Sequence, residues 1–193
     1  RIGCNHETEK AGGYGEPVTW QEPPKIDVRI SGEEGTIRFI DNGIGMTAEE
    51  LDQYVNHIAF SGAADFIRQY KGKADDKQII GHFGLGFYSA FMASDHVTIS
   101  SRSWKEGADP VFWDCDGNMQ YSMETGDRTR TGTEVTLYLD QKSRFLNPAY
   151  ANGLLKKYFE FLPIEIYLSD DTPRTEEMEQ EKRPVVKDKM IND

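Results

Sequence analysis

The chain has 193 residues, of which 37% are hydrophobic and 28% charged, a composition typical of a globular domain with a sizeable core. Its net charge of -11 argues against a surface for nucleic acid or anionic membranes, because binding to phosphate-rich surfaces requires a basic patch. No stretch approaches the roughly 18 consecutive apolar residues of a membrane helix, and the opening RIGCNHETEK has no signal-peptide core.

Two patterns come first along the chain. Residues 1–24 are polar and interrupted by glycine and proline, which predicts an irregular N-terminal segment. In residues 25–43, apolar and polar residues alternate on both sides of SGEEG, which predicts a β-hairpin. Its first strand is expected to bury one face, formed by Ile26, Val28 and Ile30.

A helix is predicted next, in TAEELDQYVNHIAF. Thr47 is followed three residues later by Glu50, the pattern of a capping box. The buried side of the helix is expected to consist of Leu51, Val55 and Ile58. The sequence of residues 61–80 predicts a short helix followed by a polar, mobile segment. The glycine-rich residues 81–86 come next and lead into FYSAFMAS, which is predicted to be a buried helix.

The remaining segments complete an α+β pattern. Four β-branched and aromatic stretches predict strands: HVTISSRS, PVFWDCD, QYSMETG and GTEVTLYLD. An amphipathic helix, NPAYANGLLKKYFEFL, and a last strand, PIEIYLSD, follow. We expect a two-layer α/β sandwich, with one mixed, mostly antiparallel sheet covered by helices on one face. The domain is predicted to span residues 25–169, and residues 170–193 have the composition of a charged linker.

The cysteines and histidines point to no metal centre or disulfide. Cys4 and Cys115 lie in unrelated contexts, which favours a reducing compartment, and we expect a cytoplasmic protein. The four histidines have no metal-ligand spacing, so no metal held by the protein is expected: His6, His57, His82 and His96.

The first chemical motif is DNGIGM, residues 41–46. Gly43 and Gly45 let the backbone approach a ligand, and Asp41 could accept a hydrogen bond from an exocyclic amine such as that of adenine. Such a charge-assisted bond contributes about 1.5–3 kcal/mol. The alternative is that DNG forms only a tight turn.

Two further motifs accompany it. The glycines of the second motif, Gly81, Gly84 and Gly86, precede a predicted helix, where unpaired backbone N–H groups and the helix dipole favour binding of a phosphate chain. The alternative is a flexible hinge, which would also use glycine. Neither a Walker loop nor a dinucleotide fingerprint fits this stretch. Gly132 and Thr133 begin a strand, where the threonine hydroxyl could join a water network around a base or simply suit the strand.

The ordered set DNGIGM, IAFSG, GHFGLGFYSAFM and GTEV resembles the nucleotide-binding domain of the ninety-kilodalton heat-shock chaperone family, bacterial type. That family shares a superfamily with gyrase, sensor histidine kinases and mismatch-repair ATPases. The resemblance runs from about Lys25 to Leu168 and implies the Bergerat fold, with ATP or ADP as ligand and Mg²⁺ bound through the phosphates. It also implies a homodimeric parent protein that assists unfolded clients through an ATP-driven lid and dimer cycle.

The resemblance also assigns residues. Asp41 would bind the adenine amine, directly and through water that Thr133 supports, and residues 61–86 would form the lid. The other expected nucleotide contacts are Ile44, Gly45, Met46 and Val55 near the base, and the backbone of Gly84, Leu85, Gly86 and Phe87 at the phosphates. Trp113 is expected to be structural.

The sequence departs from that family in places. Residues 1–24 contain no E-x-x-x-N helix, which in the family supplies the general base and a magnesium ligand, so the catalytic residues are unknown and hydrolysis is unassigned. Tyr54 and Phe60 replace the Asn and the basic residue of many members. We interpret the chain as a monomeric amino-terminal domain. The alternatives are a nucleotide-inert interaction module, or a phosphotransfer or DNA-linked relative, for which no phosphoacceptor helix or basic patch is visible.

Overall fold

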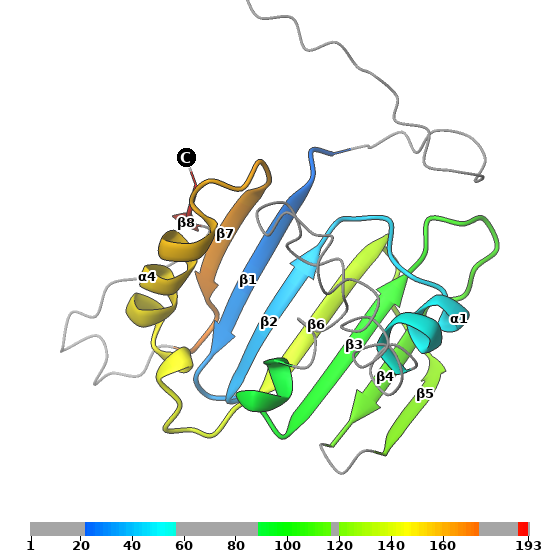
Figure 1. Ribbon diagram of the computed structural model, residues 1–193, viewed down its shortest axis with the longest axis horizontal. Coiled ribbons are helices and arrows are strands. Elements are labelled where there is room, and N and C mark those ends of the chain that lie inside the picture. The colour runs from blue at the N-terminus through cyan, green and yellow to red at the C-terminus, as the bar shows by residue number, and fades with distance from the viewer. Residues whose placement is uncertain (1–21, 57–88, 117–119, 174–188, 193) are drawn as a thin grey trace, which may run out of the picture.

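The computed structural model describes residues 22–56, 89–116, 120–173 and 189–192 (Figure 1). In these residues, eight strands form one sheet in the order β5-β4-β3-β6-β2-β1-β7-β8. Only the β1–β7 pair is parallel within this sheet, so the predicted mixed, mostly antiparallel arrangement is confirmed. The strands are β1 (Lys25–Ser31), β2 (Thr36–Asp41), β3 (His96–Arg102), β4 (Val111–Cys115), β5 (Tyr121–Thr125), β6 (Gly132–Tyr138), β7 (Glu165–Asp170) and β8 (Lys189–Met190).

The helices cover one face of this sheet. The helical elements are α1 (Ala48–Leu51), η2 (Ser89–Met92), η3 (Arg144–Leu146) and α4 (Pro148–Phe159). In Figure 1, α4 lies at the β7 end of the sheet and α1 lies in front of the β3–β5 end. No helix in the described ranges has the length and apolar character that crossing a bilayer requires.

The strand registers explain why that face is covered. Val28 pairs with Phe39 in the β1–β2 hairpin, and Ile99 pairs with Val135 and Trp113, so apolar side chains align across the sheet. Leu51 of α1 and Leu155 of α4 belong to the same buried core. The opposite face carries charged and polar residues at the alternate positions, among them Arg29, Arg38, Glu134, His96 and Asp114. The two-layer α/β sandwich is confirmed.

The predicted capping box starts α1. The Thr47 hydroxyl accepts the Glu50 N–H at 3.3 Å, and the Glu50 carboxylate accepts the Thr47 N–H at 2.9 Å. Leu51 is fully buried and Val55 is buried as predicted, while Ile58 lies outside the described residues. Helical turns of the wider π type carry the chain on to Asn56.

The link between α1 and the sheet is polar. The buried Trp113 Nε1–H donates to Asn56 Oδ1 at 3.0 Å, and Asn56 in turn donates to Asp52 at 2.7 Å. We expect Asn56→Leu to lower the free energy of unfolding by about 1–3 kcal/mol, because it removes the acceptor of a buried indole N–H. Urea unfolding measures this change, and Asn152→Leu is the control. The Asn152→Leu change removes a buried amide oxygen that has no hydrogen-bond partner in the described residues. A similar fall in the free energy of unfolding for this variant would contradict the role of the Trp113 hydrogen bond.

Residues 170–172 are attached to the β1–β2 hairpin. The Asp171 N–H donates to the Ile30 carbonyl at 2.7 Å, and Thr172 Oγ1 accepts the Gly32 N–H at 2.7 Å. Asp171 also bridges Arg29 and Arg38, which lie directly opposite each other on neighbouring strands. The carboxylate therefore separates two like charges that would otherwise repel.

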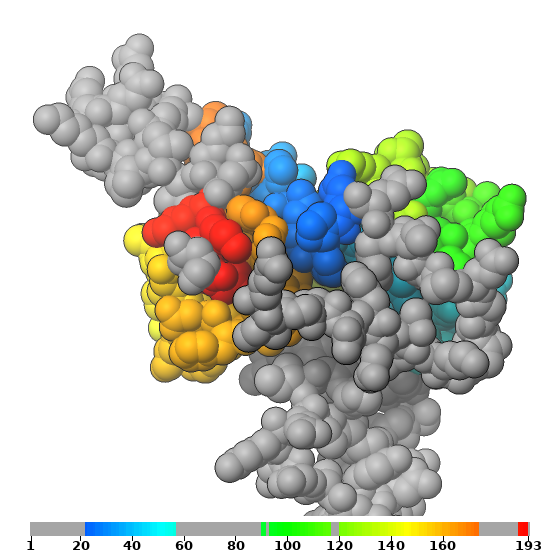
Figure 2. Space-filling view, turned by 90° about the horizontal axis from the view of Figure 1, so that it is seen from above, coloured from blue at the N-terminus to red at the C-terminus, as the bar shows by residue number. Residues whose placement is uncertain are grey.

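Residues 189–192 differ from the predicted linker of residues 170–193. They add β8 to the edge of β7, and Ile191 is only 1% exposed. The Asn192 side chain accepts the Ile166 N–H and donates to the carbonyls of Leu162 and Ile164. Figure 2 shows this segment, in red, against the yellow and orange residues of α4 and β7. Among the described residues of this charged segment, Ile191 therefore packs into the core of the domain.

One glycine weakens α4 without a packing reason. Gly153 is exposed inside the helix, and a Cβ there would meet no atom within 4 Å. We expect Gly153→Ala to raise the free energy of unfolding by about 0.5–1 kcal/mol, because alanine has less backbone entropy to lose. Thermal unfolding measures the gain, and a lower melting temperature would show that the helix is constrained there.

Candidate functional site

Asp41 is the last residue of β2 and lies on the helix-covered face. It pairs with Ile26 of β1 across the hairpin. Its Oδ1 atom accepts the Gly43 N–H at 2.8 Å and the Thr133 N–H at 3.2 Å. The carboxylate is therefore fixed by the following turn and by the start of β6, and it is partly buried.

The electrostatic environment of the Asp41 carboxylate favours a ligand that donates a hydrogen bond. Burial raises the pKa of Asp41 above 3.8, while the N–H groups of Gly43 and Thr133 and the positive charge of Arg128 act in the opposite direction. A raised pKa means that desolvation of the charged form exceeds these favourable contacts. An additional donor from a ligand would stabilise the ionised form.

The glycines of this region make room for the protein's own backbone. Gly45 has φ of 62°, and a Cβ there would lie 1.9 Å from the Arg102 carbonyl oxygen. Gly132 has φ of 122°, and its Cβ would lie 2.2 Å from the Asp41 carbonyl oxygen. The sequence explained Gly45 by close approach of a ligand, whereas the structure supplies a packing reason: the 42–46 loop lies against the end of β3.

Ser101 connects two of the predicted site segments, and none of the sequence motifs includes it. It is 0% exposed at the end of β3. Its Oγ accepts the Met46 N–H at 2.9 Å, lies 3.0 Å from Thr133 Oγ1, and lies 3.3 Å from the Gly132 carbonyl oxygen. Strand alternation could have indicated it, because Ser101 shares its face with Val97 and Ile99.

The structure thus brings part of the predicted site together. Asp41 and Thr133 are in direct contact, and Met46 joins them through Ser101. Ile44 has a half-exposed side chain, and its carbonyl accepts the Trp104 N–H at 2.8 Å. Val55 is 9% exposed and belongs to the core. Four predicted phosphate contacts, together with the expected lid, lie outside the described residues: Gly84, Leu85, Gly86 and Phe87.

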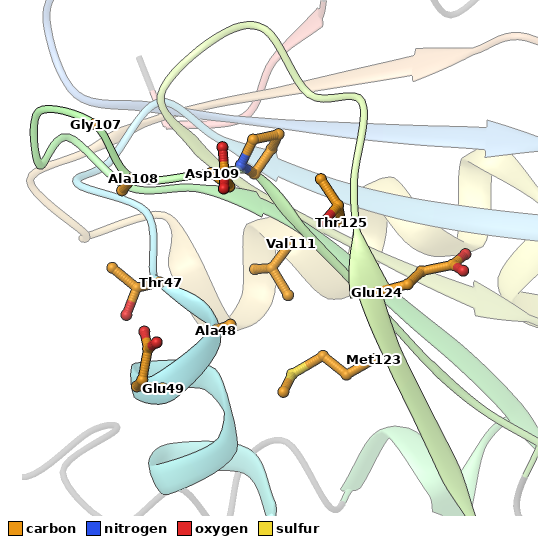
Figure 3. Close-up of a pocket in the computed structure, with 11 residues that line it drawn as sticks. Thr47, Ala48, Glu49, Gly107, Ala108, Asp109, Val111, Met123, Glu124 and Thr125 are labelled. Atoms are coloured by element: carbon orange, nitrogen blue, oxygen red, sulfur yellow. The ribbon is translucent and has the colours of Figure 1, made fainter.

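A separate cavity of about 510 Å³ lies between α1, the 107–110 loop and β5 (Figure 3). Val111 and Met123 point into the space between α1 and β5, and Glu124 points away from it. The described residues that line it are Thr47, Ala48, Glu49, Gly107, Ala108, Asp109, Pro110, Val111, Met123, Glu124 and Thr125. None of the six predicted nucleotide contacts that lie in the described residues lines this cavity. Across the described parts of the chain, no group of three or more His, Cys, Asp or Glu side chains is placed to hold a metal ion.

Comparison with known proteins identifies the family. Residues 23–124 match the model of the histidine kinase-, DNA gyrase B-, and HSP90-like ATPase family, which is more than half of the chain. The chain belongs to this ATPase family. The match includes the turn around Asp41, α1, the strands β1 to β4 and most of β5, so the family predicted from the motifs is confirmed.

Curated relatives narrow the family further. The chain is 49% identical over 142 residues to chaperone protein HtpG of Bacteroides fragilis, covering 73% of this chain and 21% of the relative. The corresponding protein of Porphyromonas gingivalis is 45% identical over 144 residues, covering 74% and 21%. That of Pasteurella multocida is 40% identical over 147 residues, covering 74% and 23%. The chain therefore spans about a fifth of the length of these relatives, and its ATPase-family domain is of the HtpG type.

Proposed function

We propose that the chain is the ATP- and ADP-binding domain of a molecular chaperone, with Asp41 as the residue that recognises the adenine amine. The observation that carries the proposal is the fixed, partly buried carboxylate at the end of β2. The family match and the HtpG relatives support the nucleotide and the chaperone parent.

The geometry suits an amine donor. Oδ1 of Asp41 already accepts two backbone N–H groups, and within the described residues Oδ2 accepts no hydrogen bond. Oδ2 is thus the oxygen that would accept the exocyclic amine, in a charge-assisted bond that contributes about 1.5–3 kcal/mol. Ile44, Met46 and Val55 would supply apolar contacts to the base, and Thr133 would hold a water molecule beside it.

The contacts to the phosphates are inferred from the glycine-rich sequence motif. The backbone of residues 84–87 would bind the phosphates, and Mg²⁺ would be bound through those phosphates. Because no general base is assigned, the proposal concerns binding, and hydrolysis by the chain alone is not part of it.

The proposal extends to the parent protein. It would be a cytoplasmic homodimer that assists unfolded clients through an ATP-driven lid and dimer cycle, as the HtpG relatives suggest. The 193-residue chain itself would be a monomer that binds neither nucleic acid nor membranes. Light scattering of the purified chain tests the oligomeric state.

A thermal-shift titration with Mg-ADP tests the proposal directly. A ligand at about 100 times its dissociation constant should stabilise the folded chain by about 2.7 kcal/mol, so the melting temperature should rise with ADP concentration. Mg-GDP, which has a carbonyl where adenine has the amine, should give a much smaller rise. No shift at millimolar ADP would instead support the nucleotide-inert interaction module.

Acidic pH should weaken binding. Since burial raises the pKa of Asp41 above 3.8, the native state binds the proton more tightly than the unfolded state. As pH falls through the raised pKa, we expect ADP affinity to fall, because the protonated carboxyl loses its charge-assisted bond. Over the same interval the contribution of Asp41 to stability increases, since a buried charge is removed. Calorimetric titrations and urea unfolding across this pH range measure both trends, and affinity that rose on acidification would contradict the assignment.

A further inference from the structure

We propose that Ser101 is a positioning residue for base selection: it donates its hydroxyl proton to Thr133, so that the Thr133 hydroxyl donates toward the base beside Asp41. The inference rests on the proposed nucleotide site and adds the residue that sets its hydrogen-bond polarity. Ser101 does not touch the ligand and acts through Thr133.

The hydrogen-bond capacity of Ser101 limits the arrangement. A serine hydroxyl has one proton to donate and two lone pairs to accept with. The Met46 N–H, at 2.9 Å, occupies one lone pair. The proton has two possible acceptors, Thr133 Oγ1 at 3.0 Å and the Gly132 carbonyl oxygen at 3.3 Å. The shorter contact, which lies closer to the usual O–H···O distance, is that to Thr133.

The choice of acceptor decides what Thr133 can offer a ligand. If Ser101 donates to Thr133, the threonine proton is free to point away from Ser101. If Ser101 donates to Gly132, Thr133 must donate back to Ser101 and can only accept from a ligand. Ser101 is 0% exposed, and its hydrogen-bond partners in the described parts of the chain are these protein groups, so the arrangement is set before any ligand arrives.

The resulting pair of groups has a defined polarity. The Asp41 carboxylate accepts, and the adjacent Thr133 hydroxyl donates, directly or through one water molecule. Adenine presents the complementary edge, with an amine that donates beside a ring nitrogen that accepts. Hypoxanthine presents the reverse, with a carbonyl oxygen beside a ring N–H. A site with fixed polarity rejects the wrong base because buried polar groups are then left unpaired.

The test compares Mg-ADP with Mg-IDP, the inosine nucleotide, by calorimetric titration of the 193-residue chain. We expect the wild type to prefer ADP and Ser101→Ala to reduce the ADP/IDP affinity ratio at least tenfold. Ser101→Thr keeps the hydroxyl and should restore most of the ratio. Thr133→Val should lower the ratio as Ser101→Ala does, and the double variant should lower it no further, because both changes remove one hydrogen-bond chain.

Ser94→Ala is the matched control for a structural effect. Ser94 is also buried, and its hydroxyl contacts the His96 and Tyr138 carbonyl oxygens at 2.6 Å, at the other end of the β3–β6 pair. It should lower the melting temperature and leave the ADP/IDP ratio unchanged. A ratio that falls equally in Ser94→Ala would overturn the inference.

The remaining outcomes separate this inference from the proposed function. If the wild type binds neither nucleotide, the proposed function fails and the inference fails with it. If ADP binds but Ser101→Ala keeps the full ratio, only the inference is overturned. Should Ser101→Ala not fold, Thr133→Val decides, since an unchanged ratio in that variant excludes any role of Ser101 acting through Thr133.

Discussion

Replacing Asp41 with asparagine is expected to reduce ADP affinity at least about 100-fold while leaving the ligand-free chain as stable as the wild type or more so. The carboxylate contributes about 1.5–3 kcal/mol through a charge-assisted bond, which corresponds to about 10- to 150-fold in affinity. Asparagine can still accept the Gly43 and Thr133 N–H groups through its oxygen, so its amide nitrogen would face the adenine amine. Two donors then meet, which adds to the loss.

Stability should move in the opposite direction. Because burial raises the pKa of Asp41, the ionised side chain destabilises the folded chain at neutral pH relative to a neutral one. Removing the charge therefore relieves this cost. Calorimetric titration with Mg-ADP and urea unfolding of the ligand-free variant measure the two effects separately.

Asp140→Asn is the matched control. Asp140 is exposed, and its carboxylate accepts the Lys142 N–H in a turn, so it has a similar local bond at a distant position. Its replacement should leave ADP affinity unchanged. Wild-type affinity in Asp41→Asn would place the adenine elsewhere and remove the basis of the proposed function.

The second large effect is expected at Gly45. Alanine there should lower the free energy of unfolding by about 3 kcal/mol or more, because φ of 62° is unfavourable for a side chain and the Cβ would lie 1.9 Å from the Arg102 carbonyl oxygen. Backbone atoms cannot rotate away as a flexible side chain would, so the 42–46 loop must separate from β3. Urea unfolding measures the loss.

Gly107 separates the two causes. It also has a positive φ, 75°, but a Cβ there would meet no atom within 4 Å. Gly107→Ala should therefore cost only the conformational term, about 1–2 kcal/mol. Equal losses at the two positions would show that the contact with Arg102 contributes nothing.

Local sequence signals predicted most of the sheet. The β1–β2 hairpin follows from alternation around SGEEG, and α1 begins at its capping box, Thr47 and Glu50. These features depend on residues that are close together in the chain, so their patterns can be recognised in a single sequence. The segment of residues 189–192 was missed for the opposite reason, since its order depends on β7 and residues 162–166, which are distant in the sequence.

The candidate site shows the same division. Asp41 and Thr133 stood out because glycines mark the turns beside them. Ser101 did not, because its importance comes from Met46, 55 positions earlier, and Thr133, 32 positions later. Gly45 was predicted as a site residue because a glycine lets a ligand approach the backbone. The sequence could not reveal the packing reason for this glycine, since the Arg102 carbonyl oxygen that it contacts is distant in the chain.

The single parallel pairing has a consequence for how the chain forms. β1 lies between β2 and β7, and the junction of β1 with β7 brings together segments as far apart as Gly32 and Thr172, which are 140 positions apart. During synthesis the β1 edge of the hairpin therefore stays uncovered until β7, residues 165–170, has left the ribosome. Pairings of such high contact order form slowly and expose strand edges to aggregation. A domain of this topology would itself gain from protection while it is being made.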